Sequence, residues 1–236
     1  MREENLNRLT TLETRISDPI YLHNSTLFRD VAAAISEHGK GDVIDIGCGN
    51  KPYQHLFKNK GKYVGCDIVQ SSDMKVDVLC SVTDIPIEDK QFDTVFSTQV
   101  LEHVAEHSKM LSEAFRLLKN GGTIILSAPM CWQHHEVPYD FYRFTKYGLQ
   151  HLFEKAGFTS IEIKANGGKW ALLGQMAQNT IMSSTRGKKG AVRAFFRFVH
   201  KYFLKYVINL LCSYLERVDK DEEFATLNFV VVAKKP

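Results

Sequence analysis

The run Asp-Val-Ile-Asp-Ile-Gly-Cys-Gly, residues 42–49, limits what this chain can fold into more than any other stretch. Its first part is apolar and β-branched, which is typical of a strand buried on both faces of a parallel sheet. Gly47 and Gly49 then allow a tight turn and the close approach of a ligand to the backbone. A strand, such a turn and a helix leave N–H groups facing a crevice. A tight turn that binds nothing can also carry two glycines. The rest of the sequence is therefore needed to distinguish a ligand-binding turn from one without a ligand.

Composition indicates one cytoplasmic globular protein. A length of 236 residues suffices for one α/β domain with an appendage, and a hydrophobic content of 44% is ordinary for a globular protein. The first residues are charged, and no stretch of about 20 residues is apolar enough to span a bilayer, so neither a secretory signal nor a membrane span is expected. The five cysteines form no C-x-x-C pair, which favours reduced thiols in the core.

The charges are distributed unevenly. The span 163–215 contains nine basic residues and no acid, although the net charge of the whole chain is only +3. The remainder of the chain is therefore acidic. An acidic body with one basic segment indicates a local partner surface and argues against nucleic acid as the partner.

Strand-like and helix-like segments alternate along the chain. This alternation predicts a Rossmann-like, doubly wound α/β sheet, mostly parallel. We expect a single domain over 1–236, with an N-terminal helical arm (1–41) and a helical insertion (165–225) that is far longer than an ordinary loop. The expected strands are about 42–46, 62–67, 76–79, 92–97, 123–127, 158–164 and 227–233, and the expected helices begin near Asn24, Pro52, Ala105 and Thr145.

Two acids follow the glycine turn in an order that suits adenosine. Asp67 ends the second expected strand about twenty residues later, where a carboxylate can accept hydrogen bonds from both ribose hydroxyls. Asp84, in the loop after the third strand, can accept from the adenine amine while the Ile85 amide meets a ring nitrogen. Taken singly, each acid is also explained as a cap or loop residue. The dinucleotide-binding fingerprint G-x-G-x-x-G requires a third glycine, but this sequence continues with Lys51 and Pro52 after Gly49. An NAD enzyme is therefore the weaker alternative.

Several motifs in this order resemble the class I S-adenosylmethionine-dependent methyltransferases, over residues 42–157. The similar segments are Asp45-Ile-Gly-Cys-Gly49, Gly65-Cys-Asp-Ile68, Asp84-Ile-Pro86, Phe92-Asp-Thr-Val95, Gln99-Val-Leu-Glu-His-Val104 and Leu117-Leu-Lys-Asn-Gly-Gly-Thr123. The resemblance implies S-adenosyl-L-methionine as cofactor and an antiparallel last strand. It also implies a set of cofactor-binding residues: Asp45, Gly47, Cys48, Gly49, Asp67, Ile68, Asp84, Ile85, Gln99 and His103. Asn120 departs from the family at a position where proline is commoner.

The segment 132–145 follows the fifth expected strand, on the same crevice edge as the glycine turn. It mixes flat apolar side chains with polar ones, a combination that binds sugars and small aromatic molecules. It resembles a methyltransferase subgroup associated with glycan and lipid-linked polysaccharide assembly. Alternatively, its aromatic residues are core and its charges an internal network. The substrate-binding candidates are Trp132, Tyr139, Asp140, Tyr142 and Arg143.

Methyl transfer to a hydroxyl requires an acceptor held near attack distance and a group that removes its proton. The candidates for this base, in order, are His135, Glu136 and His134. His103 is expected to line the cofactor pocket or to cap a helix. No metal site is expected, because neither an H-E-x-x-H motif nor a cysteine cluster is present.

The insertion contains a basic amphipathic helix. Apolar positions fill its span from Ala191 to Leu215, and Arg193, Arg197, Lys201 and Lys205 recur every four residues. Such a helix can lie on an anionic membrane surface, with the partner region spanning 186–215. The alternatives are a lid or homodimer helix whose apolar side is buried, and a site for single-stranded RNA.

The sequence as a whole predicts a cytoplasmic methyltransferase, with a peripheral position at the inner face of the membrane as an extension of that prediction. Its expected acceptor is a hydroxyl of a glycan, a lipid-linked sugar or another small molecule. One alternative is a protein that binds S-adenosylmethionine without turnover. The other is an NAD-dependent oxidoreductase.

Overall fold

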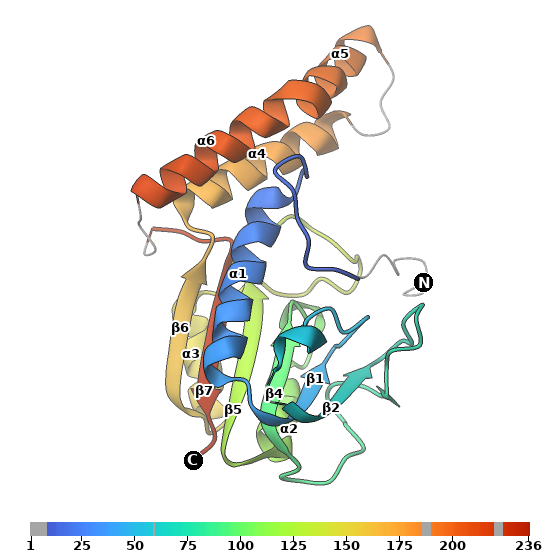
Figure 1. Cartoon of the computed structure of the whole chain (residues 1–236), viewed down its shortest axis with the longest axis vertical. Helices are drawn as coiled ribbons and strands as arrows, with labels where there is room; N and C mark the ends of the chain where they lie inside the picture. Colours follow the sequence, from blue (N-terminus) through green and yellow to red (C-terminus); the bar gives the residue numbers. More distant parts are fainter. Residues whose placement is uncertain (1–8, 59, 186–189, 220–223) are drawn as a thin grey trace.

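The computed structural model of the chain describes residues 9–58, 60–185, 190–219 and 224–236. A sheet with the strand order β3-β2-β1-β4-β5-β7-β6 forms its centre (Figure 1). The strands are β1 (Gly41–Ile46), β2 (Lys60–Asp67), β3 (Val78–Leu79), β4 (Phe92–Thr98), β5 (Leu118–Pro129), β6 (Thr159–Asn166) and β7 (Asn228–Lys234). The helices are α1 (Tyr21–His38), α2 (His107–Leu117), α3 (Lys146–Lys155), α4 (Lys169–Thr185), α5 (Ala191–Val199) and α6 (Lys205–Val218), with short turns η2 (Gln54–Leu56), η3 (Leu101–His103) and η4 (His200–Leu204).

The sheet confirms the predicted fold class. Strands β1 to β5 pair in parallel, and β7 inserts between β5 and β6 antiparallel to both. The order reverses between β1 and β4, and ligands of doubly wound sheets bind beyond the carboxyl ends of the strands at such a point. Residues 42–49 therefore lie at the position where this fold usually binds a ligand.

Both faces of the sheet are covered, as the apolar β1 sequence predicts. Ile44 and Ile46 pack in the larger core with the apolar faces of α2 and α3. Val43, one residue out of phase, packs on the other face with α1 and the aromatic rings of Tyr53 and Phe57. Because successive strand side chains point to opposite faces, a strand covered on both sides carries apolar residues at neighbouring positions, as Val43 and Ile44 do.

Several boundaries differ from the prediction. The helix expected from Pro52 is only the 3₁₀ turn η2, preceded by Lys51 in a left-handed conformation (φ 55°). Helix α1 begins at Tyr21, so the expected cap Asn24 lies inside it. Strand β5 begins at Leu118, before the Asn-Gly-Gly turn, and its pairing with β4 is irregular there. Thr145 does cap α3, since its hydroxyl accepts from the Gly148 N–H at 3.1 Å.

Helices α4, α5 and α6 extend beyond one end of the sheet, with α5, η4 and α6 forming one long arm (Figure 1). A buried polar cluster joins α6 to α4 and η4. The Gln178 amide donates to Asn209 Oδ1 at 2.5 Å, and its carbonyl oxygen lies 2.8 Å from His200 Nε2. Three basic residues of the predicted span, Arg186, Lys188 and Lys189, lie outside the described residues. The predicted division into an N-terminal helical segment (1–41), a single domain (1–236) and a helical insertion (165–225) stays a prediction.

Among the described residues, no helix combines the length and the hydropathy needed to cross a lipid bilayer.

Candidate active site

A cavity of about 980 Å³ opens at the carboxyl ends of the central strands. The loops after β1, β2, β3, β4 and β5 contribute to its wall, and so does the first turn of α1. Of the predicted cofactor-binding residues, eight line it: Asp45, Gly47, Cys48, Gly49, Asp67, Ile68, Gln99 and His103. Eight of the ten residues predicted to bind the cofactor therefore lie at one cavity.

The glycine turn has the backbone geometry that its sequence predicted. Gly47 and Gly49 have φ values of 76° and 49°, a region that residues with a Cβ rarely adopt. A Cβ at Gly47 would also collide with the side chain of Val100. The Gly49 N–H donates a 3.1 Å hydrogen bond to Oδ2 of Asp67. The turn after β1 and the acid at the end of β2 are thereby held together at the cavity.

Asp45 supplies a second carboxylate beside the turn. It is fully buried at the end of β1, and it accepts a 2.7 Å hydrogen bond from the hydroxyl of Tyr63 on β2. Burial raises the pKa of Asp45 from 3.8 to about 7, although the Tyr63 hydrogen bond and the positive charge of Lys51 oppose the shift. A cationic group bound in the cavity would favour the ionised form.

The structure corrects the predicted adenine contacts. Ile85 is buried, and its N–H donates to Oε2 of Glu113 at 2.8 Å instead of facing the cavity. Asp84 is exposed and is absent from the cavity wall. The neighbouring Val82 and Thr83 line the cavity in their place. The prediction assigned Asp84 and Ile85 from a local motif alone. In the structure the Ile85 N–H is already bonded to Glu113 on α2.

The loop after β5 brings part of the predicted acceptor set to the same cavity. Trp132, His135, Glu136 and Tyr139 all line it. His134, by contrast, is absent from the wall and its side chain is 93% exposed. Burial, with a smaller contribution from nearby His103, lowers the pKa of His135, so its imidazole is neutral near pH 7. A neutral imidazole is the form that can accept a proton.

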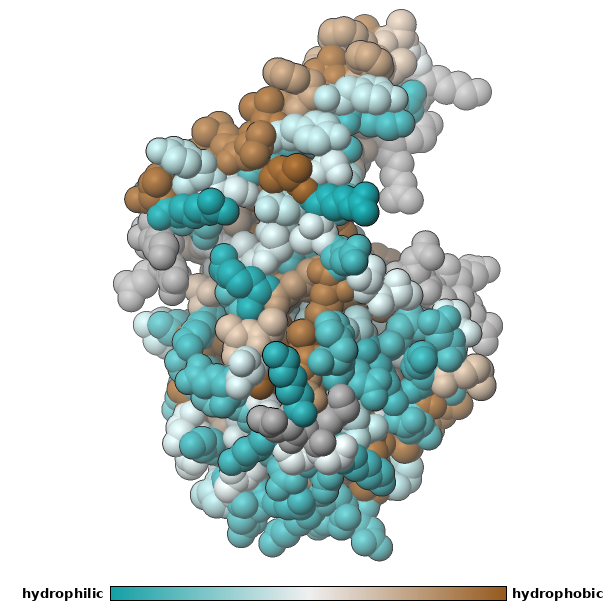
Figure 2. Space-filling model, in the orientation of Figure 1, coloured by the Kyte–Doolittle hydropathy of each residue, from teal (hydrophilic) through white to brown (hydrophobic). Residues whose placement is uncertain are grey.

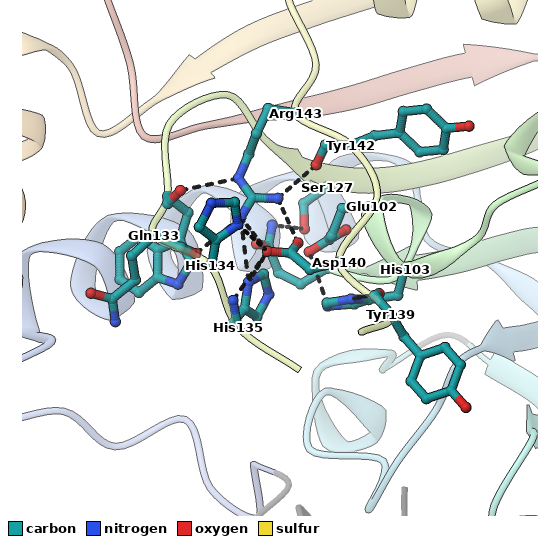
Figure 3. Close-up of polar contacts among 12 residues, drawn as sticks. Glu102, His103, Ser127, Gln133, His134, His135, Tyr139, Asp140, Tyr142 and Arg143 are labelled. Atoms are coloured by element: carbon teal, nitrogen blue, oxygen red, sulfur yellow. Dashed lines mark hydrogen bonds and ion pairs between the residues drawn. The ribbon is translucent and has the colours of Figure 1, made fainter. Parts of the chain in front are cut away.

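The other three predicted substrate contacts are instead part of an internal network (Figure 3). The Arg143 guanidinium donates to both oxygens of Asp140, at 2.7 and 2.9 Å, and to the carbonyl of Trp132 at 3.2 Å. Hydrogen bonding from Arg143 lowers the pKa of Asp140, whose side chain is 3% exposed. Tyr142 donates its hydroxyl to the carbonyl of Ala105 at 2.9 Å. These side chains shape the loop and do not line the cavity.

Glu102, in the turn η3 after β4, was not predicted as a site residue. Its side chain is completely buried, and neither carboxylate oxygen has a hydrogen-bond partner among the described residues. Burial raises its pKa to about 8. One oxygen lies 3.8 Å from Nε2 of His103, and one ligand atom from each of Glu102, His103 and His135 falls within a span of 4.8 Å. The only sequence signal was an acid directly before a histidine already placed near the cofactor.

The first turn of α1 is a second contribution that the sequence did not predict. Ile20, His23 and Asn24 line the cavity on the side of the acceptor loop. The ring of His23 lies 4.4 Å from that of Trp132, centroid to centroid. The beginning of α1 therefore forms part of the cavity wall next to the loop after β5.

Comparison with known proteins agrees with this geometry. Residues 44–126, from β1 to β5, match the model of a family described as a methyltransferase domain. This part of the chain is therefore similar to a methyltransferase domain. The match includes the glycine turn, Asp67 and Glu102, whereas the acceptor loop and the helical arm lie beyond it.

Curated relatives match only part of this chain. The chain is 30% identical over 117 residues to a protein of Methanocaldococcus jannaschii, covering 46% of this chain and 55% of that one. It is 30% identical over 97 residues to a probable S-adenosylmethionine-dependent methyltransferase of Mycolicibacterium smegmatis, covering 37% and 38%. The chain therefore spans about half or less of the length of these curated relatives.

Solved structures share the fold over nearly the whole chain. Phosphoethanolamine N-methyltransferase 2 of Haemonchus contortus, solved in complex with S-adenosyl-L-methionine, has a TM-score of 0.54 at 16% identity, covering 94% of this chain and 56% of that one. A possible histamine N-methyltransferase of Thermotoga maritima gives 0.57 at 18% identity, covering 92% and 93%.

The residues of the cavity wall fit S-adenosylmethionine. The Asp67 carboxylate is held at the cavity by Gly49, where it can accept from ribose hydroxyls. Asp45 offers a buried carboxylate for an ammonium group, and Ile68 and Val82 offer apolar surface for a purine. At Gly47 a side chain would collide with Val100, so only a glycine keeps this part of the wall open.

Proposed function

We propose that the chain is an S-adenosylmethionine-dependent methyltransferase that methylates a hydroxyl of a glycan, a lipid-linked sugar or another small molecule. One observation carries the proposal. The same cavity is lined by the glycine turn with Asp67 and by a neutral histidine, His135, with a carboxylate, Glu136. A cofactor site and a group that removes a proton are therefore adjacent.

Different residues of the cavity wall bind different parts of S-adenosylmethionine. Asp67 accepts from the ribose, Asp45 pairs with the ammonium group, and the turn at Gly47 leaves room for the amino-acid part. Bound S-adenosylmethionine supplies an electrophilic methyl group on a sulfonium. The remaining requirement is a nucleophile aligned with that methyl group, which the enzyme meets by holding the acceptor in place.

His135 is the proposed base. Its ring lines the cavity, its pKa is lowered, and it is oriented by contacts on one side with Asp140, whose Oδ2 lies 3.5 Å from His135 Nδ1. A nearby carboxylate can orient an imidazole and favour its protonated form. Glu136, on the same wall, is the second candidate. His134 is no longer a candidate base, because it is exposed and lies outside the cavity wall.

The rest of the cavity wall supports this acceptor class. Trp132 and Tyr139 offer flat apolar surface, while His23 and Asn24 of α1 offer polar contacts. Sugar rings present one apolar face and a rim of hydroxyls, and this mixture is complementary to them. Small aromatic acceptors with a hydroxyl fit the same description, so both classes belong in the test.

The test of the proposal is turnover against a panel of acceptors. Purified enzyme would be incubated with isotope-labelled S-adenosylmethionine and with glycans, lipid-linked sugars or phenols, and the products analysed by mass spectrometry. We expect one acceptor class to gain a methyl group on oxygen. Tight binding of S-adenosylhomocysteine without transfer to any acceptor would favour the binding protein without turnover.

The helical arm supports a second part of the proposal, a peripheral position at an anionic membrane surface. Large apolar side chains on α5, η4 and α6 are exposed, with Phe203 65% exposed, contrary to a helix whose apolar side is buried within this chain. The others include Val192, Phe195, Phe196, Phe198, Tyr202, Leu210, Leu211 and Tyr214. Figure 2 shows this hydrophobic surface in brown along the arm, interrupted by hydrophilic side chains. Exposed apolar surface of this extent indicates an interaction site.

The charges on the arm favour lipid as its partner. Arg193, Arg197 and Lys201 are exposed on the same helical arm, and Lys205 is partly exposed. Each basic residue near an anionic surface contributes about 1 kcal/mol of attraction. Apolar residues interleaved with cations are typical of a helix lying in the headgroup region of a bilayer. A lipid-linked acceptor would then reach the cavity from that surface.

Flotation with liposomes tests the membrane part. We expect binding to vesicles that contain phosphatidylglycerol, weakening as salt rises, and almost none to neutral vesicles. Replacing Arg193, Arg197, Lys201 and Lys205 by glutamine should abolish flotation without changing the affinity for S-adenosylhomocysteine. If the wild type does not float at low salt but is a dimer that dissociates in the Phe195→Ser/Phe203→Ser variant, the arm is a dimer interface.

A further inference from the structure

We propose that Glu102, His103 and His135 bind one divalent transition-metal ion in the wall of the cavity. Their ligand atoms, one from each side chain, all lie within 4.8 Å of one another. Glu102 and His103 belong to η3 after β4, and His135 belongs to the loop after β5, so the fold assembles the cluster from two neighbouring strands. Figure 3 shows the three side chains in one region of the site.

The buried carboxylate of Glu102 is the first reason. It is 0% exposed, and both of its oxygens lack a hydrogen-bond partner among the described residues. Burying a carboxylate without a partner costs free energy, and such groups are normally paired or coordinate metal ions. A cation beside Glu102 would remove this cost.

The orientation of His103 is the second reason. Its Nδ1 lies 2.7 Å from the carbonyl oxygen of Tyr139. A carbonyl can only accept, so Nδ1 carries the proton and Nε2 keeps a free lone pair, directed to the side where Glu102 lies 3.8 Å away. A histidine that ligates a metal through one nitrogen usually donates the other N–H to a carbonyl or carboxylate in this way.

The third ligand, His135, has an edge-to-face contact with His103, at 4.6 Å between ring centroids. Beyond it lies Asp140, 3.5 Å from His135 Nδ1 and held by Arg143. This carboxylate can orient the imidazole as an outer partner. Two histidines and one carboxylate suit Zn²⁺, Fe²⁺, Mn²⁺ or Co²⁺ and leave coordination positions open.

The place of the ion gives it a role that rests on the proposed function. His103 and His135 line the cavity and Glu102 lies behind them, so the open positions face the acceptor side. A hydroxyl bound to the ion would lose its proton more readily, because the cation stabilises the alkoxide. The proton passes to Glu136 or to solvent, the oxygen lone pair forms the bond to the methyl carbon, and the carbon–sulfur bond breaks with its electron pair remaining on sulfur. If His135 holds the ion, its effect on turnover is that of a ligand and not of a base.

Metal binding can be measured without turnover. The full chain, freed of any affinity tag and stripped with a chelator, would be titrated with Co²⁺, followed by its visible absorption, and with Zn²⁺ by calorimetry. We expect one ion per chain. Glu102→Gln, which keeps size and removes charge, should weaken binding at least about tenfold, and His103→Ala and His135→Ala should do the same.

His134→Ala is the matched control, because this exposed histidine adjoins His135 but lies outside the cluster. It should keep both stoichiometry and affinity. Circular dichroism and S-adenosylhomocysteine binding would show that each variant is folded. Absence of stoichiometric binding by the wild type, or unchanged affinity in Glu102→Gln, would overturn the metal site. Either result would leave the methyltransferase proposal standing if S-adenosylhomocysteine still binds.

Discussion

Tyr63 on β2 donates a 2.7 Å hydrogen bond to Asp45 at the end of β1, inside the protein and next to the glycine turn. Burial raises the pKa of this carboxyl to about 7, above its usual 3.8. The folded state therefore binds a proton more tightly at Asp45 than the unfolded state does. The stability from this group is fully present below pH 3.8 and is lost as the pH rises through about 7.

The Asp45→Asn variant tests this assignment. Between those two pH values the free energy of unfolding of the wild type should fall relative to the variant, by up to about 1.4 kcal/mol per pH unit. Denaturant unfolding at several pH values measures the difference. Parallel pH profiles for the two proteins would show that Asp45 is ionised throughout. In the wild type, affinity for S-adenosylhomocysteine should rise with pH towards neutrality, because its ammonium group pairs with the ionised carboxylate.

The second prediction separates Asp67 from Asp84. Asp67→Ala should weaken S-adenosylhomocysteine binding by about 1.5–3 kcal/mol, because charge-assisted hydrogen bonds to the ribose are lost. Asp84→Ala should have no effect, since Asp84 is exposed and lies outside the cavity wall. Calorimetric titration of both variants gives the comparison. An equal loss in both would return Asp84 to the cofactor site and contradict the corrected adenine contacts.

The third prediction concerns the loop after β5. Asp140→Asn should lower the free energy of unfolding by about 1.5–3 kcal/mol, because the Arg143 guanidinium would lose its charged partner. The loop should then hold Trp132 less firmly, so KM for the acceptor should rise while cofactor affinity changes little. Thermal unfolding and steady-state kinetics measure the two effects. A normal melting temperature with a raised KM would instead make Asp140 a direct substrate contact.

Local sequence patterns brought most of the expected cofactor-binding residues to one cavity. The glycines and Asp67 follow directly from strands β1 and β2, whose adjacency in a doubly wound sheet is fixed by the fold. The Asp84 and Ile85 assignment failed, because Glu113 on α2 competes for the Ile85 amide and no local pattern reveals that contact.

The acceptor half depended on contacts between distant segments. Asp140 and Arg143 pair with each other, and Arg143 also donates to loop carbonyls, which turns two polar candidates into structural residues. Glu102 lies more than thirty residues before His135, and only the pairing of β4 with β5 brings the two together. The exposure of the apolar side chains on α5 and α6 could not be predicted from the sequence either. An apolar helical stripe has the same sequence pattern whether it is buried or exposed.

The most direct test of the account is the rate of methyl transfer by wild type, His135→Ala and His134→Ala with the best acceptor from the panel. We predict a fall of about 10²–10⁴-fold for His135→Ala, with nearly unchanged affinity for S-adenosylhomocysteine. His134→Ala should stay within about threefold of the wild type, since it keeps the cavity wall intact. A wild-type rate in His135→Ala would contradict the account, because the cavity would then have lost the residue on which its chemistry depends.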